Sequence, residues 1–141
     1  MKPLFLPFVF LIALNSFGQK WQPIDGKIMS RWAKKVTPDN VWQEYPRPQF
    51  KRATWKNLNG IWDYAILKSN QPKPKSFVGK ILVPFSFESA LSGVGKSINP
   101  EDKMWYRKKF SIPNEWKGKK ILINFEAVDH DTNVWINGIF V

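Results

Sequence analysis

The C-terminal third of the chain, residues 105–141, alternates apolar and polar residues over short segments, and this pattern constrains the fold most strongly. β-Branched and aromatic residues recur at every second position, as expected for one face of a β-strand. The residues that share a face are Tyr106, Phe110 and Ile112 in the first segment, Ile121, Ile123, Phe125 and Ala127 in the second, and Val134 and Ile136 in the third. The pattern therefore predicts three β-strands.

A hairpin is predicted at Asn137-Gly138, between the last two apolar runs. Both residue types tolerate the positive φ that a type I′ turn needs, so this pair is a strong hairpin signal. The returning strand, residues 139–141, is shorter than the five or six residues of a typical strand. We therefore expect a β-domain that is incomplete at its C-terminus.

Two further strands are predicted earlier in the chain. Residues 61–67 place Trp62, Tyr64 and Ile66 on one face, and residues 80–83 form a strand that Pro84 ends. A long irregular loop, residues 88–103, follows. No helix longer than two turns is expected after residue 50, so the sequence predicts an all-β fold, a β-sandwich or jelly roll.

Residues 1–18 are predicted to be a signal peptide. Lys2 precedes an apolar run at residues 4–14, and Ser16 and Gly18 are small residues suited to cleavage before Gln19. The run is shorter than the roughly 20 residues needed to cross a bilayer, so no membrane span is expected. We expect export to the periplasm or the extracellular space; the alternative is an uncleaved N-terminal anchor.

Residues 19–50 form the second predicted region, an extended N-terminal arm rich in turn-forming residues. Residues 28–36 could form one or two helical turns. Trp21, Trp32 and Trp42 are expected to be buried and to hold the arm on the domain, because Trp is usually largely buried. The alternative is that one of them stacks on a sugar. Residues 51–141 are the third region, the first part of the β-domain.

Composition excludes several kinds of site. The 141 residues suit one domain, and the absence of Cys excludes disulfides, thiolate metal sites and thiol nucleophiles. With a single His, a His-rich metal site is excluded too. The net charge of +11 suits an anionic partner, but the basic residues are scattered without a long basic run. We therefore expect no nucleic-acid partner, no metal and no cofactor.

Two segments imitate functional motifs. Residues 90–97 resemble a relaxed phosphate-binding loop, but no helix is predicted after them to bind the anion. Asp129-His130-Asp131 could bind a metal, although a turn between strands is the favoured interpretation. The available carboxylates, which are Glu88, Glu101, Asp102, Asp129 and Asp131, show no spacing that selects an acid and nucleophile pair. No catalytic residues are predicted in this chain.

Four blocks of residues occur in a characteristic order between about residues 42 and 141. They are Glu44-Tyr45-Pro46-Arg47-Pro48-Gln49 with Trp55 and residues 58–64, then Val83-Pro84-Phe85-Ser86-Phe87-Glu88-Ser89, then Trp105-Tyr106-Arg107 with Phe110, Ile112, Pro113, Trp116 and Gly118, and finally residues 125–129 with 134–138. Each block alone is weak, but the ordered set resembles the N-terminal sugar-binding domain of glycoside hydrolase family 2, which includes β-galactosidases, β-glucuronidases and β-mannosidases.

The resemblance implies a jelly-roll domain that precedes an immunoglobulin-like domain and a TIM barrel, with both catalytic glutamates on the barrel. It implies a glycan or glycoside as substrate and the remainder of the glycosidase as partner. The loop after Pro84 runs towards the sugar pocket in relatives, which makes Glu88 and Ser89 candidate substrate-binding residues; local hydrogen bonding within the loop is the alternative. The resemblance also implies that the chain, as a fragment, is inactive alone.

Three functions compete at this point. The first is an N-terminal fragment of an exported, β-galactosidase-like retaining glycosidase that acts in polysaccharide breakdown. The second is a stand-alone carbohydrate-binding module without catalysis, and the third is a cationic surface protein. The short returning strand after Gly138 favours the first, because an independent module should close its sheet and cover its edges.

Overall fold

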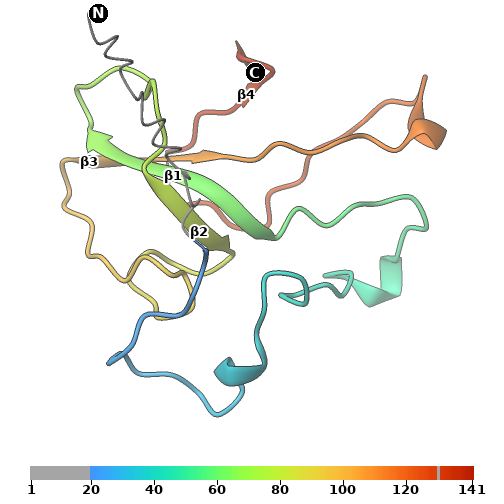
Figure 1. Ribbon diagram of the computed structural model, residues 1–141. Helices are drawn as coiled ribbons and strands as arrows, with labels where there is room; N and C mark the ends of the chain where they lie inside the picture. Colours follow the sequence, from blue (N-terminus) through green and yellow to red (C-terminus); the bar gives the residue numbers. More distant parts are fainter. Residues whose placement is uncertain (1–19, 130) are drawn as a thin grey trace, which may run out of the picture. The chain divides into compact units, whose positions relative to one another are not determined.

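A three-stranded antiparallel sheet organises the first of the two units into which the chain divides (Figure 1). The computed structural model of the chain describes residues 20–129 and 131–141, so the predicted signal peptide, residues 1–18, lies outside the described residues. The first unit reaches Lys108, and the second is Lys109–Val141.

The sheet has the strand order β2-β1-β3, with β1 (Gly60–Lys68) at its centre. β2 (Gly79–Val83) and β3 (Asp102–Arg107) both pair with it in antiparallel fashion. The strands predicted at residues 61–67 and 80–83 are thus confirmed.

The alternation predicted a strand from residue 105 to residue 113, whereas β3 begins at Asp102 and ends at Arg107. Its last pair joins Arg107 to Asp63. Beyond that pair, the Ile61 carbonyl of β1 accepts a hydrogen bond from Lys108 Nζ at 2.8 Å. A side chain therefore occupies an acceptor that a longer β3 would use for its backbone ladder.

The core lies on one face of this sheet. Tyr64, Ile81, Phe87 and Val94 form a buried cluster, and Trp62, Ile66, Val83 and Ile98 pack around it. The prediction that Trp62, Tyr64 and Ile66 share a face is therefore confirmed. Phe87 and Val94 come from the long loop between β2 and β3, so this loop is part of the core and not a loose connection.

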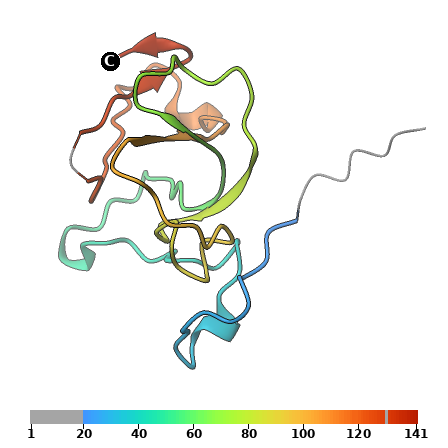
Figure 2. The same cartoon turned by 90° about the vertical axis from the view of Figure 1, so that its left-hand side faces the viewer.

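The segment before the sheet contains two 3-10 helices, η1 (Ala33–Lys35) and η2 (Pro48–Phe50). The first falls within the predicted helical turns at 28–36. Trp21 is partly buried, and its Nε1 donates to the Leu91 carbonyl at 3.1 Å. The Ile24 amide donates to the Ala90 carbonyl at 2.9 Å, so residues 21–24 run along the loop after β2 (Figure 2).

Two of the three tryptophans expected to be buried are exposed. Trp32 is 60% exposed and Trp42 is 66% exposed, so the prediction is wrong for both. Their neighbours Ala33 and Val41 are buried instead. At each place the chain turns a small or branched apolar residue inward, which directs the adjacent indole outward.

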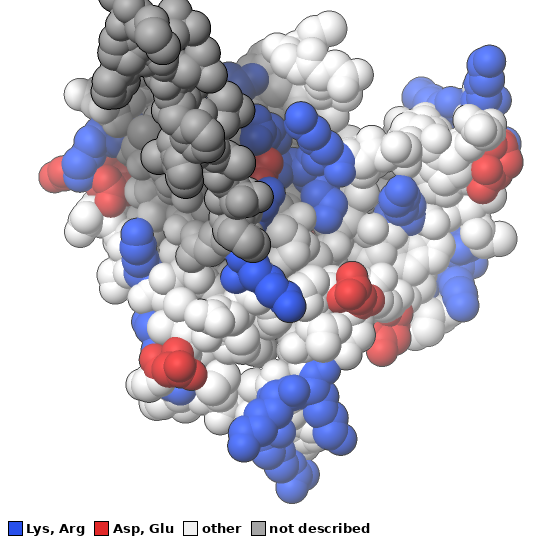
Figure 3. Space-filling model, in the orientation of Figure 1, with Lys and Arg blue, Asp and Glu red and all other residues white. Residues whose placement is uncertain are grey.

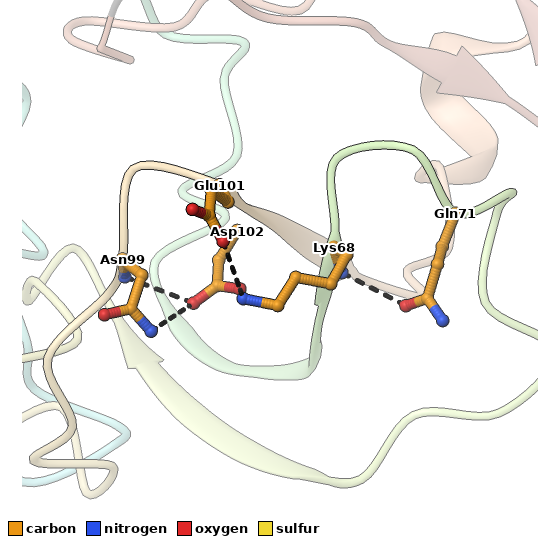
Figure 4. Close-up of polar contacts among 5 residues, drawn as sticks. All are labelled: Lys68, Gln71, Asn99, Glu101 and Asp102. Atoms are coloured by element: carbon orange, nitrogen blue, oxygen red, sulfur yellow. Dashed lines mark hydrogen bonds and ion pairs between the residues drawn. The ribbon is translucent and has the colours of Figure 1, made fainter.

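A polar cluster joins the end of β1 to the start of β3 (Figure 4). Lys68 Nζ lies 2.9 Å from Asp102 Oδ1 and 3.4 Å from Glu101 Oε2. The other Asp102 oxygen accepts from the backbone amide of Asn99 at 3.1 Å and from its side-chain amide at 3.0 Å. The Lys68 amide donates to Gln71 Oε1 at 3.1 Å. These contacts fix the register at this end of the sheet.

The second unit contains η3 (Asn114–Trp116) and a two-stranded hairpin of β4 (Trp135–Ile136) and β5 (Ile139–Phe140). Asn137 and Gly138 have φ values of 51° and 86°, as the predicted type I′ turn requires. Trp135 pairs with Phe140, and their rings lie 5.5 Å apart. The predicted hairpin is confirmed.

The strand predicted from Ile121 to Ala127 does not form. Alternation shows which residues could share a face, but a strand also needs a neighbour that pairs with its backbone. Within the described part of Lys109–Val141, the only paired strands are β4 and β5. The apolar side chains of this segment remain partly exposed, among them Leu122 and Phe125.

The chain is all-β: its sheets are antiparallel and its helices in the described ranges are three-residue 3-10 turns. The jelly-roll arrangement stays a prediction. Across residues 20–129 and 131–141, no helix has the length and apolar character needed to cross a bilayer.

Candidate functional site

Glu88 and Ser89, the predicted substrate-binding residues, lie together in the loop that follows β2. The Glu88 side chain is exposed, and its carbonyl accepts a hydrogen bond from Lys27 Nζ at 2.8 Å. Ser89 is half-buried; its hydroxyl donates to the Ser86 carbonyl at 2.8 Å and accepts from the Ser92 amide at 3.2 Å. The Ser89 hydroxyl thus takes part in local loop bonding, whereas the Glu88 carboxylate faces solvent.

Ser92 organises this loop from inside. Its side chain is fully buried, and its Oγ lies 3.1 Å from the Phe87 carbonyl and 2.8 Å from the Ser89 carbonyl, to which it can donate. The same oxygen accepts from the amides of Val94 at 3.0 Å and Gly95 at 3.4 Å. A single hydroxyl therefore holds the backbone on both sides of Glu88.

A row of aromatic rings runs beside the loop on the core face of the sheet. Tyr64 and Phe87 have centroids 5.2 Å apart, Phe87 and Tyr106 5.6 Å, and Tyr106 and Trp62 6.5 Å, each pair edge to face. Trp62 Nε1 donates to the Leu58 carbonyl at 2.8 Å. Tyr64 and Phe87 are buried, Trp62 is half-buried and Tyr106 is 39% exposed, so the row leads from the core towards the surface.

The Tyr106 phenol and the Glu88 carboxylate interact electrostatically. Burial raises the pKa of Tyr106 to about 12, and the negative charge of Glu88 adds to the increase. The phenol therefore stays neutral at physiological pH and keeps its O–H as a donor. Sequence reasoning missed Tyr106 as a site residue, because its place opposite Tyr64 follows from the pairing of β3 with β1, which the sequence pattern does not specify.

Together these groups suit the recognition of a hydroxyl-rich ligand. A carboxylate accepts hydrogen bonds, a neutral phenol both donates and accepts, and a half-buried indole offers an apolar surface. Sites for small ligands typically combine such a surface with a few polar groups that fix orientation. The arrangement can therefore bind and orient such a ligand.

The carboxylate of Asp63 has a structural role in the sheet. It lies directly between Lys80 and Arg107 in the cross-strand register and forms ion pairs with both. Burial alone would raise the Asp63 pKa, but the hydrogen bonds and charges of the two basic residues hold this pKa below its ordinary value. The Arg107 guanidinium also lies 4.1 Å from the centroid of the Phe77 ring.

The segments that imitate functional motifs have other roles. In residues 90–97, the amides of Val94 and Gly95 bond to Ser92, and no helix follows the loop. His130 lies outside the described residues, so the structure does not describe the Asp129-His130-Asp131 segment as a unit. In the described ranges, no group of three or more His, Cys, Asp or Glu side chains is placed to hold a metal ion.

Comparison with known proteins relates short stretches of the chain to glycoside hydrolases. The chain is 50% identical over 36 residues to a β-glucuronidase of Formosa agariphila. It is 49% identical over 37 residues to a β-galactosidase of Thermoanaerobacter pseudethanolicus. Each of these matches covers 26% of this chain. A longer match, 92 residues or 61% of the chain, is 23% identical to a β-glucuronidase of Paenibacillus borealis. No family model matches the chain.

The matches cover a small part of each relative: 4% of the F. agariphila protein, 5% of the T. pseudethanolicus protein and 15% of the P. borealis protein. The chain is thus related to glycosidases over limited regions, and it spans a small fraction of the length of the curated relatives it matches.

Proposed function

We propose that this chain is the N-terminal sugar-binding part of an exported β-glycosidase of glycoside hydrolase family 2, most similar to β-galactosidases and β-glucuronidases. Its role is to bind a glycan or glycoside, while hydrolysis of the glycosidic bond takes place on another part of the same protein. The observation that carries the proposal is the near-50% identity of short stretches to both a β-glucuronidase and a β-galactosidase.

The loop after β2 supports a binding role. It carries the exposed Glu88 carboxylate, whose charge acts on the neutral Tyr106 phenol, and the Tyr106 ring lies 6.5 Å from the half-buried Trp62 ring. Sugars offer hydroxyls to such acceptors and donors and C–H faces to aromatic rings. We propose that Glu88, with Ser89 next to it, contacts the sugar in this way.

The proposed whole protein has further parts. An immunoglobulin-like domain and a TIM barrel with the catalytic glutamates would follow the sugar-binding domain, and residues 1–18 would direct the protein to the periplasm or the outside of the cell. Genomic sequencing downstream of the Val141 codon tests this arrangement. An open frame that continues into a (β/α)8 barrel supports it, and an immediate stop codon contradicts it.

Binding is tested by titrating the chain with methyl β-D-galactoside and methyl β-D-glucuronide while tryptophan fluorescence is followed. We expect saturable binding, and we expect Glu88→Gln to weaken it. Glu115→Gln changes an exposed carboxylate of η3 and should leave the binding unchanged. We also expect no release of nitrophenol from the corresponding nitrophenyl glycosides. If the purified chain hydrolysed these glycosides and Glu88→Gln abolished the hydrolysis, the catalytic site would lie in the loop that carries Glu88.

A further inference from the structure

A second surface that combines aromatic and basic groups lies on the N-terminal segment. It consists of Arg31, Trp32, Lys34 and Lys35, around the 3-10 helix η1, and is called the η1 surface below. In Figure 3 basic side chains gather at the lower end of the view, where Figure 1 shows η1.

The turn that carries this surface is held in place from behind. Ala33 is buried, and its amide donates to the Ser30 carbonyl at 3.0 Å. The Asn40 side-chain amide donates to the Lys35 carbonyl at 2.8 Å, and the Asn40 side-chain oxygen accepts from the Thr37 amide at 2.7 Å. Trp32 is therefore presented outward by a bonded turn.

Arg31 and Trp32 form a cation–π pair. The guanidinium carbon lies 4.3 Å from the centroid of the indole ring. Such a pair orients the ring and places a positive charge over one of its faces. Because Trp32 remains 60% exposed, a large part of the indole is still open to solvent next to that charge.

A cavity of about 260 Å³ that is widely open to solvent adjoins the η1 surface. It is lined by Gln22, Pro23, Asp25, Met29, Ala33 and Lys34. Lys34 belongs to both features, which makes them continuous. The volume lies below the roughly 300–1,000 Å³ of sites that enclose a drug-sized ligand, so it suits one small ring with hydroxyls for Gln22 and Asp25.

The surroundings of this surface are strongly basic. Between residues 20 and 56 there are nine Lys or Arg residues and three Asp or Glu residues. Of the ion pairs found within the described ranges, none involves Arg31, Lys34 or Lys35. Their charges are available to an anionic ligand. The positive electrostatic field of these basic residues accelerates the association of such a ligand.

We propose that the η1 surface binds an acidic polysaccharide, one that carries carboxylate or sulfate groups. A pyranose ring stacks on the open part of Trp32, the acidic substituents pair with Lys34 and Lys35, and one sugar unit enters the adjoining cavity. The exposed indole of Trp32 offers an apolar face to a sugar ring, and Gln22 and Asp25 offer acceptors to its hydroxyls, which suits a polysaccharide. The inference rests on the proposed function, which is glycan binding, and it specifies which class of glycan the chain binds.

The test is fluorescence polarisation of the 141-residue chain with a fluorescein-labelled oligogalacturonate, compared with a neutral cello-oligosaccharide of the same length. We expect tighter binding of the oligogalacturonate. Trp32→Ala and the double change Lys34→Gln with Lys35→Gln should each weaken it about tenfold, which corresponds to about 1.4 kcal/mol. Because these side chains are exposed, thermal unfolding of the variants should match that of the parent chain.

Matched controls separate this site from general charge and from the Glu88 loop. Trp42→Ala removes another exposed indole, and Lys119→Gln with Lys120→Gln removes two charges elsewhere; both should change binding less than about twofold. Glu44→Gln, which changes an exposed carboxylate of the same segment, should leave oligogalacturonate binding intact. The methyl glycoside titration tests the Glu88 site with different ligands, so a failure of that site would not be mistaken for a failure here.

Several outcomes would overturn the proposal. Equal losses in the control variants would mean that binding depends on net charge and not on the η1 surface. Equal affinity for the neutral oligosaccharide, or no measurable affinity for the oligogalacturonate, would also contradict it. Tighter binding of single-stranded DNA or of phosphatidylserine vesicles, weakened by the same variants, would assign the surface to a different class of partner.

Discussion

Gly79 lies directly opposite Tyr64 in the pairing of β1 with β2, and the tyrosine ring occupies the space where a side chain at Gly79 would lie. A Cβ atom added at Gly79 would be 2.8 Å from Tyr64 Cε1 and 3.2 Å from its Cζ and hydroxyl oxygen. The Tyr64 ring is buried and packs edge to face on Phe87. The glycine therefore serves close packing in the core.

Replacing Gly79 with alanine should destabilise the first unit. The buried Tyr64 ring has little room to move, and overpacking of this kind costs about 1–3 kcal/mol. Urea unfolding monitored by tryptophan fluorescence measures the loss. In a double-mutant cycle with Tyr64→Leu, the loss should shrink, because the smaller side chain removes the contact. A loss of the same size in both backgrounds would contradict the steric explanation.

Replacing Ser92 with alanine should destabilise the loop after β2. The change removes the acceptor of the buried Val94 amide and the donor to the Phe87 and Ser89 carbonyls. A buried group left without a partner costs about 1–3 kcal/mol. Denaturant unfolding measures this cost, and hydrogen exchange of the Val94 amide should accelerate. Ser97→Ala, at an exposed position, serves as the control and should change neither quantity.

The contribution of Asp63 should depend on pH. Its pKa in the folded chain is lowered, so the stabilisation is present above the unfolded-state pKa of about 3.9 and is lost as the pH falls through the lower folded value. At pH 7 Asp63→Asn should cost about 1 kcal/mol, the order expected for partly exposed ion pairs. Urea unfolding at pH 7 and at pH 3 measures the difference.

The cost of Asp63→Asn should be smaller at pH 3 than at pH 7, since the stabilisation linked to the Asp63 charge declines below the unfolded-state pKa of about 3.9. Asp39→Asn, which changes an exposed carboxylate outside the sheet, is the control. A cost that stayed constant between the two pH values would mean that the ion pairs with Lys80 and Arg107 add nothing to stability.

The Tyr106 phenol should titrate late. Its pKa is about 12, because burial and the Glu88 charge both disfavour the phenolate. Ultraviolet absorbance of the phenolate follows this titration. Glu88→Gln should lower the pKa only in part, since burial is the larger cause, and Glu115→Gln should leave it unchanged. The pKa of Tyr106 is higher in the folded chain than in the unfolded chain, where it is about 10. Any stability linked to the phenol proton is therefore lost as the pH rises above about 10.

The sequence predicted those elements whose cause is local. Alternation located β1 and β2, and the Asn137-Gly138 pair specified a turn with two positive φ values. The segment 121–127 shows the limit, because alternation contains no information about a pairing neighbour. Trp32 was misjudged for a related reason: a large apolar residue tends to be buried, but which neighbour turns inward depends on the path of the chain.

The candidate site was predictable only in part. Glu88 and Ser89 came from a family resemblance and not from spacing, and their role stays a prediction. Tyr106 becomes a candidate only when β3 pairs with β1 and the Glu88 charge acts on its phenol. The bonding of Ser92 depends on how the loop folds back, which single-sequence reasoning does not determine.

The buried hydroxyl of Ser92 has a consequence for the thermodynamics of ligand binding. It bonds the carbonyls of Phe87 and Ser89, and Lys27 bonds the carbonyl of the residue between them, so the backbone of Glu88 is fixed at three successive positions. The conformational entropy of this loop is therefore lost when the chain folds. A ligand bound at Glu88 would therefore find the backbone of this loop already ordered, so its affinity would not be reduced by the ordering of a mobile loop.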